Sequence, residues 1–216
     1  MHRICFIDDD GDFEIPLFKD VFGGDYDIIA ATDYENAKKQ INESCGWTPD
    51  LFVLDLYFPD GAPDTEAIAT LKSNPLQLPD DSAAIRSAYS NYLVARSRLQ
   101  DILSAHKQGP EGGLKLASMI ARDFPETPIV FYSRKATFED VVRCLATKGV
   151  RWVEKKPSGK TDAETKVLTR DQKGRIIRNF NRAIEGQGDS SHSPIQDAAR
   201  VTLEAVASLF GSRRKE

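Results

Sequence analysis

The sequence predicts a doubly wound α/β fold, in which helices cover both faces of a parallel β-sheet. Two observations lead to this prediction. Short apolar runs, bounded by turn residues, alternate along the chain with segments of helical periodicity. The run at residues 51–54 is apolar at every position, which is typical of a strand buried on both faces of a parallel sheet. Right-handed crossovers between such strands build one sheet with helices on both sides.

The first half of the chain contains three of these strands. We expect them at residues 3–7, 26–31 and 51–54. A helix follows each of the first two strands. Gly23 and Gly24 end the first helix, and Asp33 is placed to cap the second. The third strand ends in a single carboxylate, Asp55, before the chain turns at Pro59.

The regular alternation is interrupted between residues 60 and 110, where we expect a helical insert. One helix is predicted at residues 65–71, and Pro75 and Pro79 separate it from a longer helix that ends near His106. The longer helix has an apolar stripe at three- and four-residue spacing, which predicts that it packs against another part of the molecule. The stripe consists of Ile85, Ala88, Tyr89, Tyr92, Leu93, Leu99, Ile102 and Leu103.

The alternation resumes after Pro110. We expect a helix, a strand, a helix, a strand and a helix at residues 112–122, 128–132, 138–147, 150–153 and 175–184. The polar residues 158–167 are predicted to form a loop. Residues 1–184 then form one domain that contains the insert at residues 60–110. Residues 185–216 form a linker and a C-terminal helical extension, with its helix at residues 194–210.

Composition and cysteine usage indicate an ordinary soluble protein of the cytoplasm. Hydrophobic residues make up 40% of the 216 residues, charged residues make up 29%, and the net charge is −4. Cys5, Cys45 and Cys144 are scattered and odd in number, so we expect free thiols. Met1 leads directly into a strand and no stretch approaches about 20 apolar residues, so we expect neither a signal segment nor a membrane span. The basic run at residues 213–215 is too short to predict nucleic-acid binding.

Polar side chains stand at the carboxyl ends of four predicted strands. They are Asp8 and Asp9 after the first strand, Asp55 after the third, Ser133 after the fourth and Lys156 after the fifth. Because the carboxyl ends of parallel strands lie at one edge of the sheet, we expect these side chains to converge there. Crowded carboxylates raise one another's pKa unless a cation lies between them, and all-oxygen ligands favour Mg²⁺ or Mn²⁺. A lysine and a hydroxyl beside that cation are what a phosphoryl group needs.

In their order along the chain, these motifs resemble those of response-regulator receiver domains of two-component signalling. The motifs that match are the acidic pair Asp8-Asp9, the phosphoacceptor segment Asp55 to Pro59, the switch hydroxyl of Ser133 and the pair Lys156-Pro157. The resemblance covers about residues 1–58 and 109–184, with the insert between them. It implies a flavodoxin-like, five-stranded parallel sheet with the strand order 2-1-3-4-5.

The resemblance also implies a role for each matching residue. Asp55 would accept a phosphoryl group from the phosphohistidine of a sensor histidine kinase or a phosphotransfer protein. Asp9, Asp55 and the backbone carbonyl of Tyr57 would hold Mg²⁺ or Mn²⁺, and Asp8 would act through a bound water or a neighbouring ligand. Lys156 would pair with Asp55 and then with the phosphate, and Ser133 would move to donate a hydrogen bond to it.

Four features depart from the family's pattern. Arg134 follows the switch hydroxyl where the family has a small residue, and it either covers the site or adds a positive charge beside the phosphate. Val153 occupies the position of the family's aromatic switch, with Trp152 one place away. Tyr57 is bulky where it can slow the water that removes the phosphate. The insert either covers the site or offers a new docking surface.

Alternatives to this interpretation remain open. A pseudo-receiver would keep the fold and signal without phosphate. A phosphatase of the haloacid dehalogenase type would use Asp8 as nucleophile, Asp10 as acid and base, and Ser133 as its hydroxyl. For the receiver, no reaction is expected beyond phosphorylation and dephosphorylation of the chain itself. Its output would be contact with a downstream protein through the insert or the C-terminal helix, and homodimerisation is left open.

Overall fold

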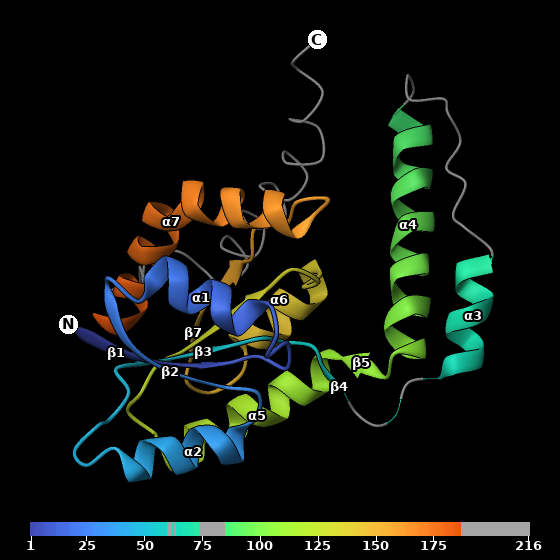
Figure 1. Cartoon of the computed structure of the whole chain (residues 1–216). Coiled ribbons are helices and arrows are strands. Elements are labelled where there is room, and N and C mark those ends of the chain that lie inside the picture. Colours follow the sequence, from blue (N-terminus) through green and yellow to red (C-terminus); the bar gives the residue numbers. More distant parts are fainter. Residues whose placement is uncertain (60–61, 63, 74–84, 187–216) are drawn as a thin grey trace.

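A computed structural model describes residues 1–59, 62, 64–73 and 85–186 of the chain (Figure 1). Its centre is a parallel five-stranded sheet with the order β2-β1-β3-β6-β7. The strands are β1 (His2–Ile7), β2 (Tyr26–Ala31), β3 (Leu51–Leu54), β6 (Ile129–Ser133) and β7 (Val150–Lys155). Because β6 and β7 are the fourth and fifth strands of this sheet, the predicted flavodoxin-like order 2-1-3-4-5 is confirmed.

Helices cover both faces of the sheet. On one face lie α1 (Glu14–Phe22) and α7 (Asp162–Ile184), and on the other lie α2 (Tyr34–Glu43), α5 (Pro110–Asp123) and α6 (Phe138–Leu145) (Figure 1). Alternate residues of each strand enter the two cores. In β1, Phe6 faces α1 and stacks on the ring of Phe18 at 4.0 Å, whereas Cys5 and Ile7 face α2 and α5. This two-sided burial explains why the strands are almost continuously apolar.

Two helix starts show where local sequence signals succeed and fail. The predicted cap is confirmed, because the Asp33 carboxylate accepts a hydrogen bond from Asn36 N at 2.9 Å. The predicted loop at residues 158–167 is confirmed only for residues 158–161, and the predicted helix start at residue 175 is wrong, since α7 begins at Asp162. The Thr161 hydroxyl caps it by accepting a hydrogen bond from Glu164 N at 3.2 Å.

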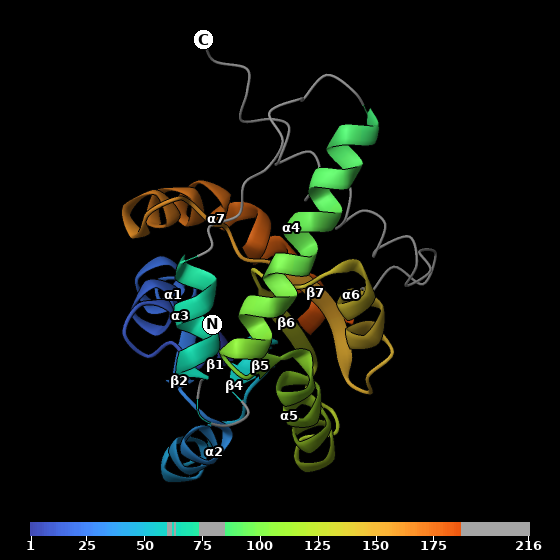
Figure 2. The ribbon, with the colours of Figure 1, turned by 90° about the vertical axis from the view of Figure 1, so that its right-hand side faces the viewer.

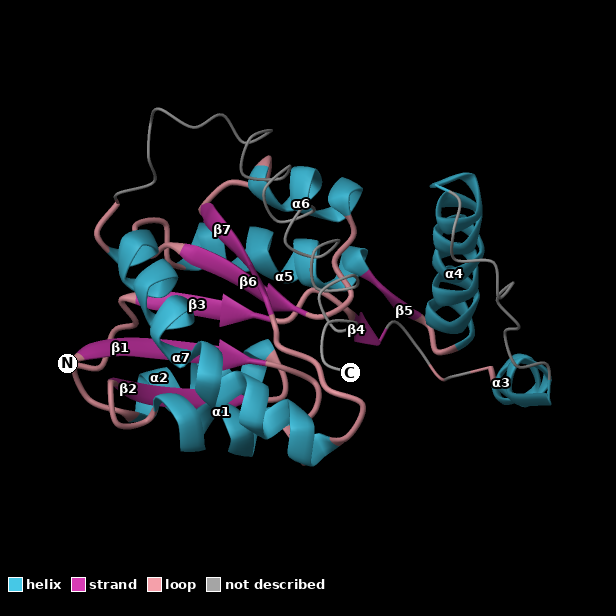
Figure 3. Cartoon of the chain, turned by 90° about the horizontal axis from the view of Figure 1, so that it is seen from above, coloured by secondary structure: helices cyan, strands magenta, loops and turns pink. Residues whose placement is uncertain are grey.

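The insert is attached through a short antiparallel stem. In this stem β4 (Phe58–Pro59) pairs with β5 (Gln108–Gly109). Beyond the stem stand α3 (Thr65–Ser73) and α4 (Ile85–Ala105), the two helices that we predicted. Figures 2 and 3 show that both helices project away from the sheet, past the carboxyl ends of its strands. The insert therefore lies on the side of the molecule where the candidate site residues are found.

The apolar stripe of α4 is only partly buried, which corrects the prediction. Leu103 is buried and Leu99 packs against the core on the α2, α5 and α6 side of the sheet. Leu93 is 43% exposed, because the upper part of α4 extends beyond the body of the domain (Figure 1), and Ile102, beside the buried Leu103, is 38% exposed. Arg96 adds a polar contact, with its guanidinium 2.7 Å from a carboxylate oxygen of Glu139 on α6. The side chains of Ile85, Ala88, Tyr89 and Tyr92 lie outside the described residues.

Other expectations concern the ends and the thiols of the chain. The predicted C-terminal helix at residues 194–210 lies outside the described residues. Cys5, Cys45 and Cys144 are free thiols, as predicted. In the described segments, no helix is both long and apolar enough to cross a membrane.

Candidate functional site

The sheet register brings the predicted site residues to one edge. Asp55 follows β3 directly, and its backbone N–H donates to the carbonyl of Ile7, the last residue of β1, at 2.9 Å. This bond fixes Asp55 beside Asp8, which follows β1. At the other side, Lys156 N donates to the carbonyl of Ser133 at 3.2 Å. Four strands therefore deliver their terminal polar residues to the same place.

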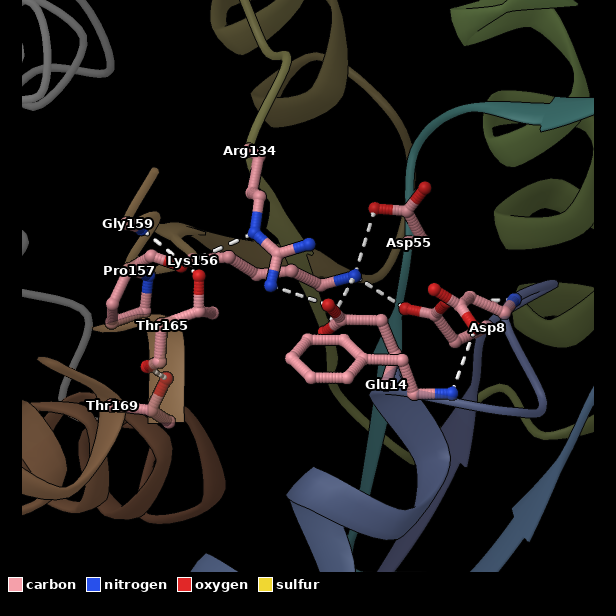
Figure 4. A network of polar contacts seen from close by, with 11 residues as sticks. Asp8, Glu14, Asp55, Arg134, Lys156, Pro157, Gly159, Thr165 and Thr169 are labelled. Carbon is pink, nitrogen blue, oxygen red and sulfur yellow. Dashed lines mark hydrogen bonds and ion pairs between the residues drawn. The ribbon is translucent and has the colours of Figure 1, made fainter. Parts of the chain in front are cut away.

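The centre of the site is the ammonium group of Lys156, whose residue is only 4% exposed. It forms ion pairs with Asp8 and, at 3.3 Å, with Asp55 (Figure 4). Burial alone lowers the pKa of Lys156, but the carboxylates of Asp55, Asp8 and Glu14 outweigh it and hold the pKa above its ordinary value. The lysine is therefore charged at any physiological pH.

The acidic pair after β1 lies in two different environments. Asp8 is 1% exposed, and one of its oxygens accepts a hydrogen bond from Asp10 N at 3.1 Å. Burial, opposed by Lys156 and supported by the charge of Asp55, raises the pKa of Asp8 to about 6. Asp9 is half-buried, and burial followed by the charge of Asp55 raises its pKa as well. Negative charge is thus crowded around Asp55.

The residues present fit a hard divalent cation bound mainly through water. In the described part of the chain, no three His, Cys, Asp or Glu side chains are grouped as ligands of one ion. Mg²⁺ needs no such cage, because it uses one or two carboxylates and keeps several waters. Asp9 and Asp55 repel each other, as the raised pKa of Asp9 indicates, and a cation near both would relieve that repulsion. The donor set is therefore suitable for Mg²⁺ or Mn²⁺.

A second polar cluster begins at Tyr57, which is buried. Its backbone N–H donates to the Asp55 carboxylate at 3.1 Å, and its hydroxyl donates to Asp140 at 2.6 Å. Asp140 also accepts hydrogen bonds from the backbone and the hydroxyl of Thr137, in a capping box that starts α6. The ammonium group of Lys135 lies 5.7 Å from the centre of the Tyr57 ring. The loop after Asp55 is thus bonded to the start of α6.

Ser133 is the last residue of β6. Its side chain is buried at the end of β6, and its hydroxyl has no hydrogen-bond partner among the described residues. Buried hydroxyls are normally paired, so this one needs an explanation. A phosphoryl group at Asp55 would supply an acceptor.

Glycine is required where α5 approaches the loop after Asp55. The Gly113 N–H donates to the carbonyl of Leu56 at 3.2 Å. A Cβ atom on Gly113 would overlap that carbonyl and its neighbouring backbone atoms. The first turn of α5 therefore supports the loop only because position 113 has no side chain.

The sequence did not predict the site contacts of two buried carboxylates, Glu14 and Asp140. Glu14, at the start of α1, pairs with Arg134 and lies 3.6 Å from the ammonium of Lys156. Asp140 accepts a hydrogen bond from the Tyr57 hydroxyl. An acidic residue in the first turn of a helix is common at exposed positions, so neither carboxylate carries a sequence signal of its buried role.

The predicted departures from the family's pattern can be located. Arg134 does not reach toward Asp55, because its guanidinium pairs with Glu14 and donates to the Pro157 carbonyl at 3.2 Å. Val153 is buried against the α5 and α6 side of the sheet. Trp152 lies on the opposite side and donates to Glu154 at 3.0 Å.

Comparison with known proteins yields structural neighbours only. No family model matches the chain, and no curated protein matches it. A CheY-like response regulator receiver domain protein from Methanospirillum hungatei JF-1 is 13% identical, with a TM-score of 0.47, over 86% of this chain and 98% of that one. The receiver domain of NtrX from Brucella abortus is 19% identical, with a TM-score of 0.45, over 84% and 98%. The non-phosphorylated HemR receiver domain from Leptospira biflexa is 19% identical, with a TM-score of 0.45, over 85% and 94%.

Proposed function

We propose that this chain is a response-regulator receiver, a switch that accepts a phosphoryl group on Asp55. An oxygen of Asp55 attacks phosphorus as the P–N bond of a phosphohistidine breaks, and the imidazole leaves. The phosphohistidine belongs to a sensor histidine kinase or a phosphotransfer protein. The main support is the geometry at Lys156, whose buried ammonium lies 3.3 Å from Asp55 at the carboxyl edge of a parallel sheet.

Each neighbouring residue has a defined task in this proposal. Lys156 holds the Asp55 carboxylate and then neutralises the phosphoryl oxygens. Ser133, whose buried hydroxyl lacks a partner among the described residues, donates a hydrogen bond to the phosphoryl group. Asp9, Asp55 and the Tyr57 carbonyl would hold Mg²⁺, with Asp8 beside them. The cation would supply neutralising charge for phosphoryl oxygens.

The output of the switch is proposed to be contact with another protein. The loop after Asp55 is bonded through Tyr57 to the start of α6, and α6 is paired with the insert through Glu139 and Arg96. A shift of Ser133 or Tyr57 would therefore change the position of α6 and its contact with α4. A protein partner that contacts this region could distinguish the two states.

Intact-mass measurement after incubation with acetyl phosphate and Mg²⁺ tests the proposal. The wild-type chain should gain the mass of one phosphoryl group, and the gain should disappear with Asp55→Asn or with excess EDTA. Asp12→Asn, a change in the same acidic loop, is the matched control and should label normally. Labelling of Asp55→Asn to the wild-type level would reject Asp55 as the acceptor.

The two alternatives give different results in this experiment. A pseudo-receiver takes no label from any donor. A phosphatase that uses Asp8 turns over p-nitrophenyl phosphate and loses this activity in Asp8→Asn but not in Asp55→Asn. The receiver proposal is favoured because the Asp10 carboxylate, the acid and base of that phosphatase, accepts a hydrogen bond from Phe13 N at 2.9 Å.

A further inference from the structure

Lys156 is shared by three carboxylates, and the third is Glu14. Asp8 and Asp55 were expected beside the lysine, whereas Glu14 comes from the first turn of α1 on the covering layer. One oxygen of Glu14 lies 3.6 Å from the Lys156 ammonium, and the Glu14 side chain is 6% exposed (Figure 4). The attraction between such buried charges is screened far less than at the surface. Glu14 therefore competes with Asp55 for the same positive charge.

The other oxygen of Glu14 holds Arg134. The Arg134 guanidinium pairs with Glu14, and its Nε donates to the Pro157 carbonyl at 3.2 Å. The guanidinium also lies over the ring of Phe13, 5.9 Å from its centre. Arg134 directly follows Ser133, whose hydroxyl has no partner among the described residues. These three contacts hold the guanidinium beside Glu14 (Figure 4), and no ion pair between Arg134 and Asp55 is found among the described residues.

The balance of charge in this network is negative. Among the described residues, Asp8, Asp55 and Glu14 form ion pairs with two basic side chains, Lys156 and Arg134. Asp9 adds a fourth carboxylate nearby, and the charge of Lys135 also acts on it, so carboxylates outnumber basic side chains by four to three. Until a divalent cation binds, an anionic phosphodonor that approaches Asp55 therefore meets repulsion. The charge of Glu14 contributes to that repulsion directly, and it also withholds part of the charge of Lys156 and Arg134.

We propose that Glu14 is a positioning residue for the reaction at Asp55, and that the Glu14–Arg134 pair limits how much positive charge meets the phosphoryl group. This inference rests on the proposed function of Asp55. When the Asp55 oxygen bonds to phosphorus, the phosphoryl oxygens attract Lys156 and Arg134, and Glu14 holds both back. Removing the charge of Glu14 releases both basic side chains toward the phosphoryl group.

The test compares labelling rates of Glu14→Gln, Arg134→Gln and the double variant with acetyl phosphate at saturating Mg²⁺. Glu14→Gln should lower the acetyl phosphate concentration for half-maximal rate several-fold. Arg134→Gln leaves Glu14 unneutralised, so it should raise that concentration several-fold. The double variant should return close to wild type, because each change removes the partner of the other.

Matched controls separate the inference from general effects on stability. Glu111→Gln breaks a comparable ion pair with Arg143 at the surface and should leave the half-maximal concentration unchanged. Urea unfolding of each variant shows whether it is folded, and if Glu14→Gln does not fold, slower labelling of Arg134→Gln still carries the test. A wild-type chain that takes no label rejects the proposed function. A labelled wild type with an unchanged half-maximal concentration in Glu14→Gln or Arg134→Gln rejects only the role of Glu14.

Discussion

Two polar clusters flank Asp55, and they differ in how their charges are compensated. The lysine cluster consists of Asp8, Glu14, Arg134 and Lys156. The tyrosine cluster consists of Tyr57, Lys135, Thr137 and Asp140. In the lysine cluster several carboxylates surround one ammonium group. A further negative charge would therefore change which carboxylate the ammonium pairs with. In the tyrosine cluster the Asp140 carboxylate is bonded by two hydroxyls and a backbone N–H, so it favours one arrangement.

The difference predicts that the two clusters have different roles at this edge of the sheet. Under the proposed function, a phosphoryl group at Asp55 would rearrange the ion pairs of the lysine cluster. The tyrosine cluster connects the Asp55 loop to α6 and, through α6, to the insert. Changes in the first cluster should therefore affect labelling strongly. Changes in the second should affect stability and leave labelling in place.

The largest expected effect comes from Lys156→Met, which breaks the lysine cluster. It leaves carboxylates buried without their partner, so the free energy of unfolding in urea should fall by about 3–5 kcal/mol. Labelling by acetyl phosphate should be lost. Lys155→Met is the matched control, since burial lowers the pKa of Lys155 and no carboxylate of the described residues pairs with it. Equal losses of stability in the two variants would contradict the assigned role of Lys156.

Gly113→Ala should disturb the loop that joins both clusters. The new Cβ would overlap the Leu56 carbonyl, so the loop after Asp55 must shift, at a cost of about 2–3 kcal/mol. Labelling should slow together with the loss of stability in urea. Gly24→Ala is the control, because its Cβ would meet nothing within 4 Å. A Gly113→Ala variant as stable as Gly24→Ala would show that the loop does not depend on this contact.

Tyr57→Phe tests the separation of the two clusters directly. The variant removes the hydrogen bond to the buried Asp140 and should lower the free energy of unfolding by about 1.5–2 kcal/mol. Acetyl phosphate labelling should persist, because the backbone contacts of Tyr57 remain. Tyr34→Phe removes a comparable bond to Asp123, far from the site, and is the reference for stability. Complete loss of labelling in Tyr57→Phe would show that the clusters work as one.

The smallest effect is expected at Asp123, a carboxylate outside both clusters. Hydrogen bonds from Lys38, Arg122 and Tyr34 hold its pKa below the ordinary value. Because the folded-state pKa is lowered, the stabilisation is present above about pH 4, the pKa of an unfolded aspartate, and is lost as pH falls below it. Asp123→Asn should therefore be slightly less stable than wild type at pH 7. The difference between their urea midpoints should shrink in acid, whereas a pH-independent difference would contradict the assignment.

Much of the fold could be predicted because its signals are local. The apolar run of β3 requires burial on both faces, and Asp33 caps α2 through a hydrogen bond three residues away. The meeting of Asp55 and Lys156 follows from the parallel sheet, since strand ends share an edge. These features need no knowledge of side-chain packing.

The missed features depend on contacts between distant residues. The burial of Glu14 depends on its ion pairs with Arg134 and Lys156, which lie more than a hundred residues away in the sequence. The residues that the first turns of α7 bury are the polar Thr165 and Thr169, so the helix start at Asp162 has no apolar periodicity. The strands β4 and β5 contain Pro59 and Gly109, which normally argue against strands.

The stem formed by β4 and β5 has a consequence for how the insert could have been acquired. Phe58 pairs with Gly109 and Pro59 with Gln108, so the chain leaves the domain and returns to it at nearly the same point. Loop-closure entropy grows only with the logarithm of loop length, about 0.6 kcal/mol for each doubling. A stretch of almost any length can therefore be added or removed beyond the stem without changing the order in which β3 and β6 must meet during folding. The region past Pro59 is a place where new surface can be gained while the candidate site is kept.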